Sequence, residues 1–162
     1  MIMKTIRIAL LVGAVIATVL PVRADPSEEA KKDLAKLQGE WEMVSASADG
    51  QPMPEERLSQ MKRVCTNDQV TITMAGQVFF KAKFTIDPSK KPKTIDYQMT
   101  DGFTKGQKQL GIYEFDGENV KFCFSKPGEE RPAEFKAGEG RTFSTWKKVK
   151  ESSGSTEKKN SK

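Results

Sequence analysis

The chain has 162 residues, and its 27 Lys and Arg side chains outnumber its 22 Asp and Glu side chains. The excess of positive charge lies at the two ends of the chain, since residues 25–149 hold 20 basic and 20 acidic side chains. This central part therefore lacks the uncompensated positive charge that nucleic-acid binding needs. The absence of histidine from the sequence excludes Ser-His-Asp and Cys-His catalysis and His-ligated metal sites.

Residues 1–24 have the pattern of a secretory signal peptide. Two basic residues precede an apolar stretch over residues 8–20, and Val22 and Ala24 stand at the −3 and −1 positions of a cleavage site. The apolar stretch is shorter than the ~20 residues of a membrane-spanning helix. We therefore expect an exported protein, periplasmic or extracellular, with no stable membrane insertion after cleavage. Retention of the segment as an anchor is the alternative.

The mature chain, residues 25–149, is expected to form one domain followed by a disordered basic tail. The tail, residues 150–162, holds no apolar side chain, which is typical of disorder. At the start of the domain, "DPSEEAKKDLAKL" predicts a short helix in which Asp25 is the N-cap and Glu28 completes a capping box. Helical spacing places three apolar residues of this helix on one face: Ala30, Leu34 and Leu37.

From residue 39 onward the apolar residues alternate with a period of two, which predicts strands. In "QVFFKAKFTI", for example, five apolar residues lie on one face of the predicted strand, which we expect to point toward the core: Val78, Phe80, Ala82, Phe84 and Ile86. Turn sequences such as "AG" and "DG" separate the runs, and residues 54–61 have a helical pattern. The predicted strands lie near residues 39–48, 62–66, 69–75, 77–86, 93–100, 108–115, 119–125 and 141–149.

These patterns predict an all-β fold, an antiparallel up-and-down β-barrel of about eight strands with a short N-terminal helix. A two-sheet β-sandwich is the alternative. Closure of the barrel pairs its first and last strands, which brings Trp41 close to residues 146–148 and places Trp41 and Trp146 in neighbouring strands at the seam. The same topology places Cys65 and Cys123 three strand steps apart around the barrel and points Cys123 away from the interior, so two free thiols are expected.

Four segments carry a resemblance to a known family: "LQGEWEMVSASADGQPMP", "DPSKKPKTIDY", "GIYEFDGENVKFCFSKPGEERPAEF" and "GRTFSTWKKV". In order and spacing they resemble a small exported domain family of planctomycete bacteria, and the resemblance implies a lipocalin-like barrel with no established activity. The Gly39-x-Trp41 pair is also similar to the first-strand signature of lipocalins, which carry small apolar molecules. Lipocalins place an arginine over that tryptophan, and here the corresponding region offers Lys147, Lys148 or Lys150.

No enzyme activity, cofactor or metal is expected from these residues. Neighbouring carboxylates, such as Glu55 with Glu56, diverge on a strand and are poorly placed for shared acid–base work. Two functions of different class are predicted instead. One is a ligandless envelope or protein-interaction domain. The other is a module that binds a small apolar or amphipathic molecule among inward side chains, namely Trp41, Met43, Phe80, Phe84, Tyr97, Met99, Phe122 and Phe124.

The segment "KPGEERPAEF", residues 126–135, is the most unusual loop of the sequence. Its prolines restrict the path of the chain, and Arg131 lies among acidic residues. One interpretation is a loop at the barrel mouth in which Arg131 contacts a ligand or a partner protein. The other is a stiffened loop whose arginine binds its own acids, Glu129, Glu130 and Glu134.

Overall fold

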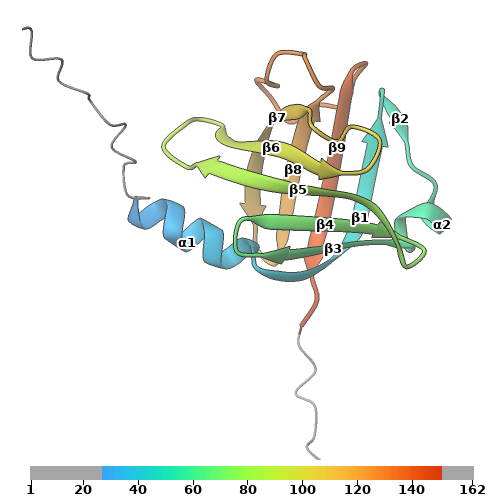
Figure 1. The fold of residues 1–162 in the computed structure, drawn as a ribbon, viewed down its shortest axis with the longest axis horizontal. Coiled ribbons are helices and arrows are strands. Elements are labelled where there is room, and N and C mark those ends of the chain that lie inside the picture. The colour runs from blue at the N-terminus through green and yellow to red at the C-terminus, as the bar shows by residue number, and fades with distance from the viewer. Residues whose placement is uncertain (1–26, 151–162) are drawn as a thin grey trace, which may run out of the picture.

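The computed structural model describes residues 27–150 and shows one nine-stranded antiparallel sheet that closes into a barrel (Figure 1). The expectations for residues 1–24 and for the tail beyond Lys150 lie outside the described residues. The strands are β1 (Gly39–Ala48), β2 (Gln51–Pro52), β3 (Met61–Thr66), β4 (Gln69–Met74), β5 (Gln77–Asp87), β6 (Lys93–Asp101), β7 (Lys108–Asp116), β8 (Asn119–Ser125) and β9 (Arg141–Lys148).

Pairing of β1 with β9 closes the barrel. Eight strands form the ring in the order β1-β3-β4-β5-β6-β7-β8-β9, and β2 is an additional short strand on the edge of β1. Trp41 lies opposite Lys148, and Met43 lies opposite Trp146. The predicted barrel and the predicted seam between the two tryptophan-bearing strands are both confirmed, and the sandwich alternative is excluded.

Lys148 is the lysine that lies over the Trp41 ring, out of the three that the sequence offered for this position. Its Nζ lies 5.1 Å from the centre of the Trp41 ring and donates a hydrogen bond to the carbonyl of Lys36 at 3.0 Å. An ammonium over an indole face is attracted by the ring quadrupole. The contact therefore links the end of β9 to the start of β1 and to the residues just before it.

The start of β5 departs from the predicted alternation. Ile72 pairs with Phe80, but Thr73 pairs with Val78, so Phe79 is an extra residue in a β-bulge. The bulge exchanges the two faces of the strand, and Val78 is 48% exposed, which corrects its expected place in the interior. The four other apolar residues expected on the inward face belong to the core or pack against it: Phe80, Ala82, Phe84 and Ile86.

The N-terminal helix α1 (Glu28–Leu37) begins later than expected. Its N-cap is Ser27, whose Oγ accepts a hydrogen bond from the backbone N–H of Ala30 at 3.1 Å. Asp25 is therefore not the cap, and Glu28 is the first helical residue rather than the third, so no capping box forms. The physical reason is that a cap must directly precede the helix to reach its free N–H groups.

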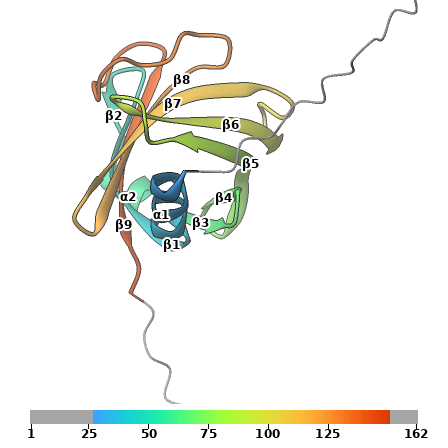
Figure 2. The same ribbon diagram turned by 90° about the vertical axis from the view of Figure 1, so that its left-hand side faces the viewer.

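Helix α1 lies across the end of the barrel at which β1 begins, called the helix end below (Figure 2). Leu37 is fully buried, and its carbonyl accepts a hydrogen bond from Trp41 Nε1 at 2.9 Å. The carboxylate of Asp33, also buried, accepts hydrogen bonds from the Tyr113 hydroxyl at 2.8 Å and from Lys93 Nζ at 2.7 Å. These contacts fix the helix against β1, β6 and β7.

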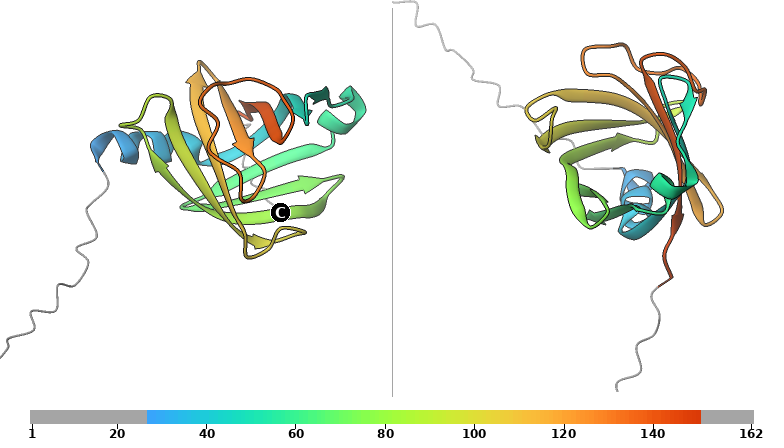
Figure 3. Two further views of the ribbon diagram at one scale, coloured as in Figure 1. Left: turned by 90° about the horizontal axis from the view of Figure 1, so that it is seen from above. Right: turned by 90° about the vertical axis from the view of Figure 1, so that its right-hand side faces the viewer.

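The two cysteines lie on opposite sides of the barrel wall, and both are free thiols, as predicted. Cys65 belongs to the interior cluster. Cys123 alternates with Phe122 and Phe124 and faces outward, where its Sγ donates to the carbonyl of Lys136 at 3.7 Å. Lys136 belongs to the connection between β8 and β9, which Figure 3 shows as a wide loop. Burial beneath this loop raises the pKa of the Cys123 thiol.

Gly111 of β7 provides room for an aromatic ring of the interior, and we predict that an added methyl group destabilises the fold. A Cβ at this position would overlap Phe124 Cδ1 and would lie 2.9 Å from the Cys123 carbonyl oxygen. Overpacking of this kind costs about 1–3 kcal/mol, so Gly111→Ala should lower the free energy of unfolding in urea by that amount.

Gly138→Ala is the matched control, because a Cβ there has no neighbour within 4 Å and should change stability by less than about 0.5 kcal/mol. Equal stability of the two variants would contradict the packing of Phe124 against Gly111.

Candidate functional site

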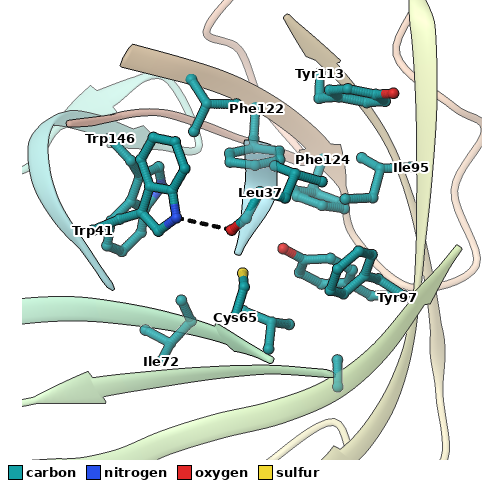
Figure 4. Packing of buried hydrophobic residues seen from close by; sticks show 14 of the residues in the cluster. Leu37, Trp41, Cys65, Ile72, Ile95, Tyr97, Tyr113, Phe122, Phe124 and Trp146 are labelled. Atoms are coloured by element: carbon teal, nitrogen blue, oxygen red, sulfur yellow. Dashed lines mark hydrogen bonds between the residues drawn. The ribbon is translucent and has the colours of Figure 1, made fainter. Parts of the chain in front are cut away.

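The barrel interior brings together all eight residues that the sequence predicted as ligand-binding. Figure 4 labels four of them, Trp41, Tyr97, Phe122 and Phe124. They come from β1, β5, β6 and β8, so four separate strands contribute to one cluster. Met43 and Phe80 are partly buried and pack against the cluster. The other six are members of its buried part: Trp41, Phe84, Tyr97, Met99, Phe122 and Phe124.

Tyr97 stands at the centre of the aromatic packing. Its ring centroid lies 4.3 Å from that of Phe124 and 6.4 Å from that of Phe84. Phe122 stacks beside Phe124 at 6.0 Å. Figure 4 shows the Tyr97 hydroxyl pointing into the middle of the cluster rather than toward the wall. The aromatic residues thus hold the Tyr97 hydroxyl inside the cluster.

The polar partner of Tyr97 is Arg63, which sequence reasoning missed. Arg63 lies on β3 between Met61 and Cys65 on the inward face, and only 1% of its surface is exposed. Its Nη1 donates to the Tyr97 hydroxyl at 2.8 Å, and its Nε donates to Cys65 Sγ at 3.2 Å. Its Nη2 is buried and has no hydrogen-bond partner among the described residues.

The charge of Arg63 is not balanced inside the barrel. No carboxylate of residues 27–150 forms an ion pair with it. The Phe122 ring lies 4.1 Å from its guanidinium carbon, a contact worth about 2 kcal/mol when desolvated. Burying an ion costs several kcal/mol, so the ring compensates only part of this cost.

At neutral pH the Arg63 guanidinium stays protonated and the Tyr97 phenol stays neutral. Burial lowers the pKa of Arg63, but Tyr97 and Cys65 beside it raise it, and the net pKa lies above the usual value. Burial raises the pKa of Tyr97 to about 12, although the neighbouring guanidinium acts in the opposite direction. The pair is therefore a cation beside a neutral phenol, with one net positive charge.

Methionines gather at the barrel end opposite α1. Met61 opens β3, Met74 closes β4, and the two lie opposite each other in register. All the methionines of residues 27–150 belong to the core cluster or pack against it. We call the barrel end that they cover the methionine end, and its residues are Met43, Met53, Met61, Met74 and Met99. The short helix α2 (Glu55–Leu58) connects β2 to β3 beside it. Methionine is unbranched and polarizable, and adapts its shape to different contacts.

Arg131 is not part of this site, which corrects its expected position at a barrel mouth. Its Nη2 forms an ion pair with Asp96 of β6 at 2.6 Å, and its Nη1 donates to the carbonyl of Gly111 at 2.7 Å. The neighbouring Pro132 is fully buried. The loop thus lies against the outer wall of β6 and β7, and Arg131 pairs with a strand residue rather than with the acids of its own loop.

Three cavities on the described residues lie outside the aromatic interior. A groove of about 640 Å³ runs between the β5–β6 connection and Arg131. Two others, of about 1010 and 700 Å³, lie beside Gly39 with Lys148 and beside Asp33 with Phe135. None of these three is lined by any of the eight predicted ligand-binding residues. Arg63 does not line any of the three either.

Comparisons of the chain with family models, with curated proteins and with solved structures found no significant match. Within residues 27–150, no group of three His, Cys, Asp or Glu side chains is arranged to hold a metal ion. No helix in that same part of the chain is long and apolar enough to cross a membrane. The function is therefore inferred from the geometry of the barrel itself.

The protonation state of the interior can be tested by tyrosine titration, because the chain has only two tyrosines. Burial raises the pKa of both Tyr97 and Tyr113, whereas a free tyrosine ionises near pH 10. We predict that the folded protein shows no tyrosinate absorbance at about pH 10. The unfolded state ionises first, so stability should fall as the pH rises from about 10 toward 12. Reversible ionisation of a folded tyrosine near pH 10 would contradict the buried pair.

A pair of variants tests whether the Arg63 charge is uncompensated. Tyr97→Phe removes a hydrogen-bond acceptor from a buried cation and should lower the free energy of unfolding by about 1–3 kcal/mol. Adding Arg63→Met removes the cation itself, and the double variant should be at least as stable as the wild type, since apolar replacement of buried ionic groups is neutral or stabilising by about 1–4 kcal/mol. Urea denaturation measures both. A double variant less stable than Tyr97→Phe alone would show that the charge is already balanced.

Proposed function

We propose that this domain binds a small apolar or amphipathic molecule inside the barrel and is not an enzyme. The eight inward residues belong to one cluster or pack against it, and Arg63 contacts two of them, Tyr97 and Phe122, so five strands contribute to the site. Aromatic and aliphatic lining with a few placed polar groups is the usual composition of a small-molecule site. The bound molecule would replace contacts that the side chains now make with one another.

The observation that carries this proposal is the contrast between the two barrel ends. The helix end is covered by α1, which is held by hydrogen bonds to Trp41, Tyr113 and Lys93. The methionine end is covered by flexible thioether side chains, of which Met43, Met53 and Met74 are only partly buried. Exposed Phe103, at 98%, lies in the connection between β6 and β7, and Phe79, at 42%, lies near the start of β5. A ligand would therefore reach the interior through the methionine end.

The setting of the domain is inferred from the sequence. The signal-like residues 1–24 support export to the periplasm or the exterior of the cell. The Gly39-x-Trp41 pair with Lys148 over its ring supports a lipocalin-like relationship, and the four similar segments support the planctomycete domain family. Within this setting the molecule would act as a carrier or sensor rather than as a catalyst.

A second candidate function, a ligandless envelope or protein-interaction domain, is favoured by the deep burial of the interior side chains. Val120 and Phe122 are completely buried, and small barrels can be filled by side chains alone. This alternative differs from the first in a measurable way, because a domain of this type would not take up an apolar probe at the methionine end.

Uptake of Nile red, a neutral apolar dye whose emission rises in an apolar site, distinguishes the two candidates. The wild type should bind the dye, and Met74→Trp should weaken binding about tenfold or more, equivalent to about 1.4 kcal/mol, because the larger ring fills the methionine end. Thr73→Trp is the matched control. It adds the same fluorophore one residue earlier on β4, on the opposite face, and should bind as the wild type does.

Circular dichroism establishes that both variants are folded. Absence of dye binding to the wild type, or equal loss in the two variants, would refute binding in the barrel and favour the interaction domain.

A further inference from the structure

We propose that the bound molecule carries a single carboxylate, which Arg63 and Tyr97 hold in the middle of the barrel. This inference rests on the proposed binding function and adds the chemical class of the ligand. It starts from the unpartnered Nη2 of Arg63, since an unsatisfied buried group in a native structure requires an explanation.

Arg63 has more N–H donors than the described residues around it accept. A guanidinium has five N–H groups in a planar fork, and the described residues accept hydrogen bonds only from Nε and Nη1. Both hydrogens of Nη2 and one of Nη1 therefore have no acceptor. These two nitrogens form the side of the fork that binds two carboxylate oxygens in parallel.

Tyr97 can add a further hydrogen bond to the same group. Its hydroxyl oxygen accepts from Arg63 Nη1 at 2.8 Å, which leaves the hydroxyl hydrogen free to donate. A neutral phenol is a donor, whereas a phenolate is not. An oxygen atom of the ligand placed between the two groups would therefore receive hydrogen bonds from both side chains.

The charge of the site favours a monoanion. Arg63 contributes one positive charge, and no carboxylate of residues 27–150 opposes it. A carboxylate would form a neutral pair, whereas a phosphate monoester near its dianionic state would leave one negative charge buried, at a cost of several kcal/mol. The Phe122 ring covers one face of the guanidinium at 4.1 Å, so an anion would approach in the plane of the fork.

The position of Arg63 along β3 sets the direction of the rest of the molecule. Arg63 lies two residues inside Met61, which is about 7 Å along a strand, and Cys65 and then α1 lie on its other side. An apolar tail attached to the carboxylate would therefore extend toward the methionine end. The ligand class is a short to medium-length aliphatic or aromatic acid whose tail contacts Met61, Met74 and Phe80.

Binding of octanoate, 1-octanol and octyl phosphate to the wild type tests the headgroup, because the three probes share one tail. We expect calorimetry to give octanoate at least about tenfold tighter binding than either of the other two. In Arg63→Met the preference for octanoate over octanol should disappear while octanol binding remains. Arg63→Lys, which keeps the charge but loses the fork, should retain only part of the preference. Lys62→Met removes a neighbouring exposed charge from β3 and should keep all of it.

The outcomes separate this inference from the proposed function. Equal binding of octanoate and octanol to the wild type would overturn the carboxylate assignment while leaving binding in the barrel intact, and tighter binding of octyl phosphate would overturn the charge count. Failure of all three probes together with failure of Nile red would refute the binding function itself. Should Arg63→Met not fold, NMR titration of carboxyl-labelled octanoate on the wild type still decides. The pKa of the bound acid should fall below its value in water, and an unchanged or raised pKa would contradict contact with the guanidinium.

Discussion

Pairing between β1 and β9 is the contact on which the other features of the molecule depend. It runs from Trp41 opposite Lys148 to Ala48 opposite Thr142 and converts an open sheet into a closed wall. In an open sheet the free edge would be at β1, the inward face of the neighbouring β3 would reach water, and Arg63 could remain hydrated. Once the wall is closed, each inward side chain must find its partners inside. The enclosed cation is therefore a direct consequence of barrel closure.

The interior around that cation is arranged by shape as well as by charge. The missing side chain at Gly111 leaves space for the Phe124 ring, and Phe124 in turn packs 4.3 Å from Tyr97. This stack fixes the phenol so that its oxygen faces Arg63. Tight packing makes such a position costly to change, so the hydroxyl is held in place before any ligand binds. If the proposed ligand binds here, a site prepared in this way would lose little conformational entropy on binding.

The sequence predicts the wall of this barrel well and its polar contacts poorly. A period of two over Trp41 to Ala48 or Val120 to Phe124 is a local signal, and the strand bounds follow from it. On β3 the signal is ambiguous, because Val64 faces outward while Arg63 faces inward, the reverse of their hydropathy. The exposure of Val78 depends on a bulge set by pairing with β4. Partnerships such as Arg131 with Asp96 join distant segments, which no local pattern reveals.

The two ends of the barrel differ in what it costs to open them. Displacing α1 would break the hydrogen bonds of Asp33 with Tyr113 and Lys93 and the bond from Trp41 to Leu37. Bonds to charged groups contribute about 1.5–3 kcal/mol each. Turning a methionine away from the opposite end disturbs no hydrogen bond, and moving a side chain about 30° off its preferred rotamer costs about 0.5–1.5 kcal/mol. Opening the methionine end therefore breaks fewer hydrogen bonds between described side chains than opening the helix end does, and the path inward from that end leads to the guanidinium of Arg63.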